Sequence, residues 1–414
     1  MWCLSSAKPQ AAIVGIAMQA RTEPKRVAAV ITEYRRWSHA DVIIGKLLEG
    51  FGHDRAAFPN LRLVSMFVDQ FPKNDMSRAL AKQHNFTIYD NIADAVTLGR
   101  KEVAVDGVLL IGEHGRYDRN ERGQILYPRR RFFESVTDVF AKHRRSVPVF
   151  NDKHLSYNWA NARWMVDRSR ELMFPFMSGS SLPVTWRRPS LRLSRGCELV
   201  EAVQVGYGPF EGYGFHALES LQCMAERRRG GETGVRAVTC LQGEAMWAAM
   251  DRGVFSRDLL EAAMAHVPAY AKGDYRKLTV KNNEAGVIII EYRDGFKAAV
   301  AMLNGWVYEG DGGAFTFAGR VRGEDRIASC QFYLQQPDPF GHFAGLLRAI
   351  DAMIQTGHAV YPVERTLLTT GILDAVMISK TEKNRRVETP HLDIRYQPSE
   401  WGFATDALPR LVKR

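Results

Sequence analysis

Three side chains able to carry a proton stand together in the run Asn151-Asp152-Lys153-His154 of this 414-residue chain. Amines, carboxylates and imidazoles all serve as general acids or bases in enzymes. A lysine does so near neutral pH only when burial or nearby charges lower its pKa, whereas an ion pair with Asp152 would raise it. We predict that Lys153 is catalytic and that Asp152 and His154 contact a substrate. A lysine held in a plain ion pair is the alternative.

His216 is the second candidate for proton transfer. It follows the turn Gly212-Tyr213-Gly214, whose glycines would leave the histidine accessible. A histidine that opens an apolar helical segment is often buried and structural, which is the competing interpretation. We predict a catalytic role for His216, with Tyr213 and Glu219 as substrate contacts.

Other polar residues share one position, because each directly follows a segment with the pattern of a strand. The carboxyl ends of parallel strands lie at one edge of a sheet, and ligands bind there, where the strand order reverses. Any one of these residues could equally be a solvated loop residue. The set is Glu33, Asp69, Glu113, His114, Asp152, Lys153, His154 and Ser178.

Two further patterns admit other chemistry. The imidazole and carboxylate groups of residues 113–114, Asp152 and His154 suit a divalent metal such as Zn, Mn or Fe. No His-x-x-x-His pair is present, so a metal stays an alternative cofactor and no ligands are assigned. Residues 129–131 are three arginines after Tyr127, which could clamp a carboxylate or phosphate or be surface charge at the start of a helix.

Short apolar runs alternate with amphipathic segments between residues 26 and 179. The runs have the length of strands, and the segments between them repeat their apolar residues at helical spacing. Such alternation predicts βαβ units and a parallel, doubly wound, Rossmann-like sheet. The predicted strands are 27–31, 61–69, 86–89, 105–112, 147–150 and 174–179, and the predicted helices are 39–50, 77–84, 91–98, 131–143 and 159–172.

The pattern changes after the segment Trp186-Arg187-Arg188-Pro189. Strand-like runs then follow one another, which predicts an α+β domain with a large open, mostly antiparallel sheet. The predicted division is a leader or disordered segment (1–24), a Rossmann-like domain (25–186), a substrate and oligomerisation domain (187–390) and a tail (391–414). The predicted strands of the second half are 198–205, 235–239, 277–280, 286–292, 297–303, 314–319 and 327–334, and the predicted helices are 215–228, 257–265, 342–356 and 365–380.

Four segments, in this order, resemble the glucose–fructose oxidoreductase / inositol dehydrogenase / MocA family. Residues 151–156 resemble that family's Glu-Lys-Pro-Leu segment, with Lys153 in the place of the lysine. Residues 175–179 are similar to the strand that follows, 212–219 to the family's glycine-rich turn into a helix with His-x-x-Asp, and 371–379 to its closing helix. The resemblance covers about residues 26 to 390, most of the chain.

The resemblance implies an oxidoreductase that uses NAD or NADP to transfer hydride on a sugar, cyclitol or related polyol. Lys153 would bind or polarise the reacting hydroxyl, and His216 would transfer its proton. Asp69 would bind the adenosine ribose, which favours NAD over NADP. Glu113 and His114 would lie beside the cofactor. The family also implies a homodimer or homotetramer that pairs the open sheets.

The turn after the first strand departs from the family. A Gly-x-Gly-x-x-Gly turn allows close approach to pyrophosphate, and residues 32–39 contain no glycine. Arg35 and Arg36 would have to hold the phosphates by their side chains, and Glu33 opposes them. The alternative function is therefore the same fold without redox chemistry. It would be a lyase, hydrolase or isomerase of a sugar derivative, metal-dependent or not, or a pseudo-enzyme that only binds its ligand.

Composition is that of an ordinary globular protein, with 46% hydrophobic and 25% charged residues. The net charge of +10 allows anionic partners, but the basic residues form short clusters and no nucleic-acid motif, so we predict no nucleic-acid partner. No apolar run approaches the roughly 18 residues of a membrane span, so we predict no membrane partner. Five scattered cysteines fit a reducing, cytoplasmic location, while the short apolar stretch 11–18 leaves an export signal as the alternative.

Overall fold

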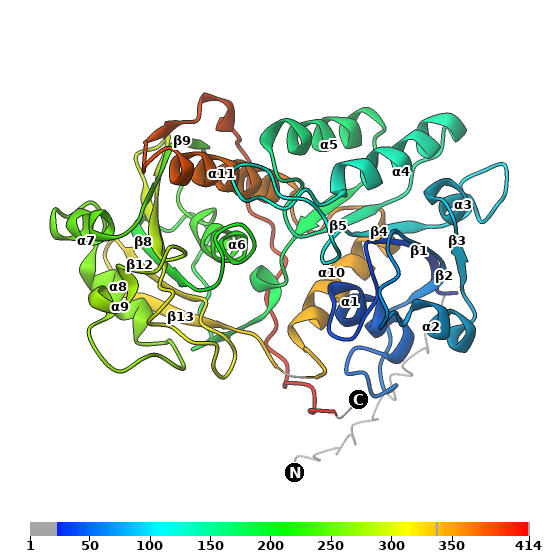
Figure 1. Ribbon diagram of the computed structural model, residues 1–414, viewed down its shortest axis with the longest axis horizontal. Helices are drawn as coiled ribbons and strands as arrows, with labels where there is room; N and C mark the ends of the chain where they lie inside the picture. The colour runs from blue at the N-terminus through cyan, green and yellow to red at the C-terminus, as the bar shows by residue number, and fades with distance from the viewer. Residues whose placement is uncertain (1–22, 337, 413–414) are drawn as a thin grey trace, which may run out of the picture.

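The computed structural model describes residues 23–336 and 338–412. Its first half is a sheet with the strand order β3-β2-β1-β4-β5-β6, in which every pair runs parallel (Figure 1). The predicted doubly wound sheet is thereby confirmed. Its elements are β1 (Lys25–Ile31), α1 (His39–Glu49), β2 (Leu61–Val68), α2 (Ser77–His84), β3 (Thr87–Tyr89), α3 (Ile92–Thr97), β4 (Gly107–Ile111), α4 (Arg129–His143), β5 (Val149–Asp152), α5 (Trp159–Glu171) and β6 (Phe176–Gly179).

The second half is built on a sheet with the order β14-β9-β10-β11-β8-β12-β13-β7. All its pairs are antiparallel except β11 with β8, so the predicted mostly antiparallel sheet is confirmed. Its elements are β7 (Trp186–Arg188), β8 (Leu199–Gly206), α6 (Tyr213–Ala225), β9 (Val235–Leu241), α7 (Glu244–Asp251), α8 (Arg257–Met264), α9 (Tyr275–Thr279), β10 (Gly286–Tyr292), β11 (Lys297–Met302), β12 (Thr316–Val321), β13 (Ala328–Tyr333), α10 (His342–Thr356), α11 (Glu364–Thr381) and β14 (Val387–Glu388), with short 3₁₀ turns at Leu182–Val184 and Pro390–Leu392.

One predicted strand is wrong, because residues 277–280 belong to the helix α9 and its end. The Asp274 carboxylate accepts a hydrogen bond from the Arg276 backbone N–H, which caps the helix start. The apolar alternation of so short a segment does not separate a strand from one turn of helix. The helix α7 and the short strands β7 and β14 were not predicted.

Helix α10 returns from the second half of the chain to the first sheet. Its residues Phe343, Leu346 and Ile350 are buried in one cluster with Val27 and Ile43 of β1 and α1. The helix therefore belongs to the core of the first sheet, although its sequence lies in the range assigned to the second domain. Its N-terminus comes close to the carboxyl ends of the parallel strands, where the site described below lies (Figure 1).

The second sheet is covered on both faces by this chain. Helices α6 and α11 pack against β8 and β9 on one face, and α8 packs against β8, β12 and β13 on the other (Figure 1). Its central strand β8 is buried from Ala202 to Gly206. The predicted homodimer or homotetramer that pairs this sheet stays a prediction.

Several predictions fall at the ends and surface of the chain. The predicted leader lies mostly outside the described residues. Cys197, Cys223, Cys240 and Cys330 are free thiols, three of them buried. In the part of the chain that the structure describes, every helix is too short or too polar to cross a bilayer.

Candidate active site

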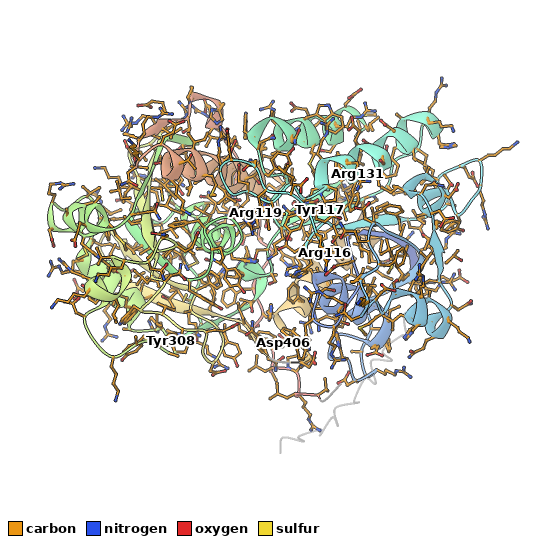
Figure 2. All side chains as sticks on the ribbon, viewed as in Figure 1. Arg116, Tyr117, Arg119, Arg131, Tyr308 and Asp406 are labelled. Atoms are coloured by element: carbon orange, nitrogen blue, oxygen red, sulfur yellow. The ribbon has the colours of Figure 1, made fainter. Side chains whose placement is uncertain are left out.

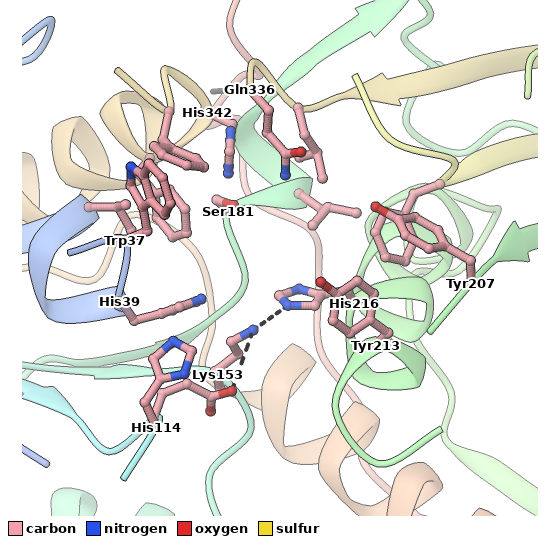
Figure 3. A pocket seen from close by; sticks show the side chains of 17 residues that line it. Trp37, His39, His114, Lys153, Ser181, Tyr207, Tyr213, His216, Gln336 and His342 are labelled. Carbon is pink, nitrogen blue, oxygen red and sulfur yellow. Dashed lines mark hydrogen bonds and ion pairs between the residues drawn. The ribbon is translucent and has the colours of Figure 1, made fainter. Parts of the chain in front are cut away.

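The first sheet and α6 bring the two predicted proton-transfer residues together. Lys153 directly follows β5 with φ of 71°, a left-handed backbone conformation that is uncommon for a residue with a side chain. Its backbone N–H donates to the Gly179 carbonyl at 3.1 Å, which ties this turn to the end of β6. The Lys153 Nζ donates to Nε2 of His216, near the start of α6, and both side chains line a cavity of about 220 Å³ (Figure 3).

His216 is held in a single protonation state by its two partners. An ammonium group only donates, so Nε2 accepts from Lys153 and the proton sits on Nδ1. Nδ1 then donates to the Ser180 Oγ at 2.6 Å. Burial and the Lys153 charge lower the pKa of His216 well below its ordinary value. The pair therefore presents a charged amine backed by a neutral imidazole.

Arg129 is the buried link between two other predicted residues. Only 1% of it is exposed, and it donates to Glu113 Oε2 at 2.5 Å and to His154 Nε2 at 2.8 Å. The Glu113 Oε1 lies 3.9 Å from the Lys153 Nζ. Burial alone would raise the pKa of Glu113, but Lys153 and Arg129 together hold it below its ordinary value. Arg129 is thus neither surface charge nor a free clamp; it fixes the carboxylate beside Lys153.

His39 is a cavity residue that the sequence analysis did not single out. It is the first residue of α1, and its Nδ1 donates to the Asp152 Oδ2 at 2.6 Å. Burial and the nearby Lys153 charge lower the pKa of His39 well below its ordinary value. Burial raises the pKa of Asp152 to about 6, against the opposing charge of Lys153. A carboxylate on Nδ1 leaves the lone pair of a neutral imidazole on Nε2, and the His39 ring projects into the cavity (Figure 3).

The predicted contacts beyond this centre divide into two groups. Tyr213 and His114 line the cavity, and His114 Nδ1 lies 3.3 Å from a guanidinium nitrogen of Arg35. Glu219 is a buried residue of α6 that accepts from the Thr369 hydroxyl of α11 at 2.7 Å, and it is not among the lining residues of the cavity. Burial raises the pKa of Glu219. It links α6 to α11 in the fold, and its predicted contact with a substrate stays a prediction.

Aromatic side chains from distant segments complete the cavity wall. Tyr207 and Phe315 come from the second sheet, and Phe343 comes from the start of α10. Trp37 projects from the turn after β1, with 57% of its surface exposed. Rings around a few convergent polar groups are typical of sites for small ligands. No local pattern in the sequence marks these residues, because each reaches the cavity only through the tertiary fold.

Comparisons with known proteins agree with this architecture. No family model and no curated protein matches the sequence. Among solved structures, GenD2 of gentamicin A biosynthesis, in complex with NAD, matches with a TM-score of 0.55 and 14% identity, covering 92% of this chain and 99% of that one. The apo scyllo-inositol dehydrogenase of Lactobacillus casei at 77K matches with a TM-score of 0.53 and 11% identity, covering 89% and 99%. An oxidoreductase of Agrobacterium radiobacter, in complex with NAD+, L-tartaric acid and magnesium, matches with a TM-score of 0.54 and 11% identity, covering 88% and 98%.

The fold is that of the glucose–fructose oxidoreductase / inositol dehydrogenase / MocA family. The predicted resemblance is confirmed at this level, in both sheets and over most of the chain. Because these sequence identities are low, the likeness shows the fold and does not show the activity. The cofactor that this fold family implies therefore has to be tested against the residues present.

The start of α1 does not fit the pyrophosphate of a dinucleotide. In this kind of fold the backbone N–H groups there and the positive end of the helix dipole hold the phosphates. Here the Ser38 Oγ accepts from the Asp41 N–H at 3.3 Å, and the Asp41 carboxylate accepts from the Trp37 N–H at 2.9 Å. Asp41 is buried, so a carboxylate of the chain itself stands beside the start of α1 and opposes an anion there.

The charged residues predicted to bind the cofactor are also paired within the chain. Arg35 donates to Glu33 at 2.6 Å, and Arg36 donates to Asp338 at 3.1 Å. The two carboxylate oxygens of Asp69 accept from Arg131 at 2.6 Å and from the Tyr117 hydroxyl at 2.7 Å; both donors are labelled in Figure 2. The guanidinium and carboxylate groups expected to meet phosphates and ribose are thus satisfied by one another.

The bond between His39 and Asp152 adds a steric argument. In the strand order, β4 lies between β1, which leads into α1, and β5, which ends at Asp152. The bond therefore joins segments that follow the strands on either side of β4, next to the switch point between β1 and β4 where a dinucleotide would lie. These residues do not fit a dinucleotide bound in the manner of the fold family.

The metal alternative depends on a cluster of imidazole and carboxylate side chains. Within residues 23–336 and 338–412, no group of three or more His, Cys, Asp or Glu side chains gathers closely enough to hold an ion. Glu113 and His154 are instead bridged by Arg129, whose positive charge stands where a cation would have to bind.

Proposed function

We propose that this protein is an acid–base enzyme that moves protons on a carbonyl-bearing sugar derivative, such as an aldose, ketose, keto-cyclitol or uronate, without transferring hydride. The observation that supports it is the presence of two proton-transfer centres on one cavity: Lys153 with His216, and His39 with Asp152. The reaction class is an isomerisation, epimerisation or elimination.

Such reactions need a base for a carbon-bound proton and an acid for an oxygen. His39 is the base, since Asp152 orients its ring and its pKa is low enough to keep it neutral. Lys153 is the acid, and its ammonium group also stabilises negative charge that develops on the substrate oxygen. Tyr213 and Ser181 line the same cavity and offer hydroxyls to a hydroxylated substrate.

Proton exchange in deuterated water tests this proposal. The purified protein would be incubated with aldoses, ketoses, keto-cyclitols and uronates, and loss of carbon-bound proton signals followed by NMR. Activity should fall by roughly 10²–10⁴ in Lys153→Met and in His39→Gln, because each removes one proton-transfer group. The exposed residues Lys281 and His358 provide the matched controls Lys281→Met and His358→Gln, which should retain activity. Absence of exchange across the panel would contradict the proposal.

Hydride transfer with NAD or NADP is the second candidate. It is favoured by the NAD complexes named for two structural neighbours. Calorimetric titration with NADH and NADPH separates the two candidates. We expect no binding up to about millimolar concentration, and a dissociation constant near ~1 μM, worth about 8 kcal/mol, would favour the oxidoreductase instead.

A further inference from the structure

A second cavity, of about 270 Å³, adjoins the first. Glu113, Lys153 and Tyr213 line both cavities, so these three residues stand between them. Cavities of these sizes have room for one hydroxylated ring in each. A molecule bound at Lys153 therefore borders a second compartment that the proposed reaction does not use.

Glu211 is an acceptor without a donor in this second compartment. It lies in the loop between β8 and α6, 8% exposed, and its Oε1 accepts no hydrogen bond from the described residues. The backbone N–H of Ile125 bonds to the same carboxyl group and holds it in place. A buried carboxylate oxygen with no donor is costly, which points to a donor supplied by a ligand.

His154 is a donor without an acceptor beside it. Arg129 can only donate, so Nε2 of His154 accepts and the proton sits on Nδ1. Nδ1 is buried and has no hydrogen-bond partner among the described residues. Glu211 and His154 line the same cavity, and the Glu211 Oε1 lies 3.9 Å from the Nε2 of the His154 ring. Sugar hydroxyls satisfy both, because each hydroxyl donates and accepts.

The charges around this cavity favour an uncharged ring. Two of its cations are neutralised within the chain, Lys380 by Glu284 at 3.0 Å and Arg122 by Asp374 at 3.4 Å. Arg119 lies on the loop before α4, between the two halves of the molecule, and donates to a backbone carbonyl (Figure 2). An anionic group would instead face the carboxylate of Glu211.

We propose that the second cavity binds a second, uncharged sugar-like unit through Glu211 and His154, so that the substrate is a glycoside of at least two units with its linkage beside Lys153. This inference rests on the proposed function for the unit in the first cavity. The assignment of the unit in the second cavity rests on Glu211 and His154, which the proposed reaction does not use.

Binding of disaccharides against monosaccharides tests the inference. Ligand-observed NMR and calorimetry would compare glucose and galactose with maltose, cellobiose, trehalose, lactose and melibiose. We expect at least one disaccharide to bind about 10-fold more tightly than its monosaccharide. Glu211→Leu should remove that difference and leave monosaccharide binding unchanged. The exposed Glu244 supplies the matched control Glu244→Leu, which should keep the difference.

Three outcomes would overturn the second subsite: equal affinity for disaccharides and monosaccharides, a preference that survives in Glu211→Leu, or no disaccharide binding at about 100 mM, a level that detects even weak sites. The deuterium experiment separates this failure from failure of the proposed function. Exchange on a monosaccharide with no preference for disaccharides removes only the subsite. A preference lost in Glu211→Leu without any exchange removes only the reaction.

Discussion

Asp152→Asn should make the protein more stable and less active. The Asp152 carboxyl is buried at the end of β5, and burial raises its pKa from 3.8 to about 6. Holding it ionised in the folded protein therefore costs free energy, and an uncharged amide of the same shape removes that cost. The amide has no negative charge, so it no longer holds the proton of His39 on Nδ1 as the Asp152 carboxylate does.

The magnitude follows from the difference between the two pKa values. A difference of about 2 corresponds to about 3 kcal/mol of unfolding free energy. Because the folded pKa is the higher one, the folded protein binds more protons between about pH 6 and 4, and stability rises as the pH falls through that window. The cost is complete above about pH 6 and absent below about pH 4. Loss of the charge-assisted bond to His39 offsets about 1 kcal/mol, which leaves a net gain of about 2 kcal/mol near pH 8.

Denaturant unfolding of the two proteins near pH 8 and near pH 4.5 measures this effect. Asp152→Asn should gain about 2 kcal/mol over the natural protein at the higher pH and much less at the lower one. The exposed Asp90 provides the control Asp90→Asn, which should change neither value. Activity of Asp152→Asn should drop steeply, since the corresponding change in a Ser-His-Asp triad costs about 10⁴ in kcat. A variant that is less stable at both pH values, or that gains equally at both, would refute the reasoning.

Two other substitutions probe the supports of the site. Arg129→Met leaves the buried groups of Glu113 and His154 without their shared donor and should cost about 3–5 kcal/mol of unfolding free energy. In a double-mutant cycle, adding Glu113→Gln should recover part of this loss. Gly179→Ala should cost more than about 1 kcal/mol by thermal unfolding, because φ is 129° there and the new Cβ would lie 2.6 Å from a Glu219 oxygen. A Gly179→Ala protein of natural stability would contradict the packing role of Glu219.

The first sheet could be predicted because its elements are marked locally. The strand at Gly107–Ile111 is apolar at almost every position, and Gly50 follows the end of α1 at a φ of 85°. The prediction of a strand at residues 277–280, where α9 lies, failed because four residues show too little periodicity to distinguish a helix from a strand. The return of α10 to the first sheet has no local mark either, since its apolar face would suit the core of either domain.

Within the site, Lys153 and His216 were found because they lie in recognisable segments. His39 was missed, because its partner Asp152 is 113 residues away and a histidine at the start of a helix has no special pattern. Glu211 was missed for a similar reason, because only the folded chain shows that its Oε1 has no hydrogen-bond donor among the described residues. Residue types can be read from sequence, but the absence of a partner can be read only from the structure.

The start of α1 explains why the glycines of the dinucleotide turn are absent. The Ser38 hydroxyl caps the helix by accepting from the Asp41 N–H, and the Asp41 carboxylate accepts from the Trp37 N–H in the turn before it. The Asp41 carboxylate beside this turn opposes a bound phosphate. Glycines would then only add flexibility, and the bulky residues 34–37 can fill the turn.

Asp41→Ala should therefore reopen an anion site. The variant should lose about 1 kcal/mol of stability through its weaker cap, and millimolar pyrophosphate should return part of that loss in a thermal shift measurement. The natural protein should not respond, because the Asp41 carboxylate repels the ligand and holds the Trp37 N–H. Ser38→Ala is the matched control, since it weakens the same cap and keeps the carboxylate. An equal response of all three proteins would show that pyrophosphate binds elsewhere, and no response of Asp41→Ala would show that the cap is not what closes this helix to phosphate.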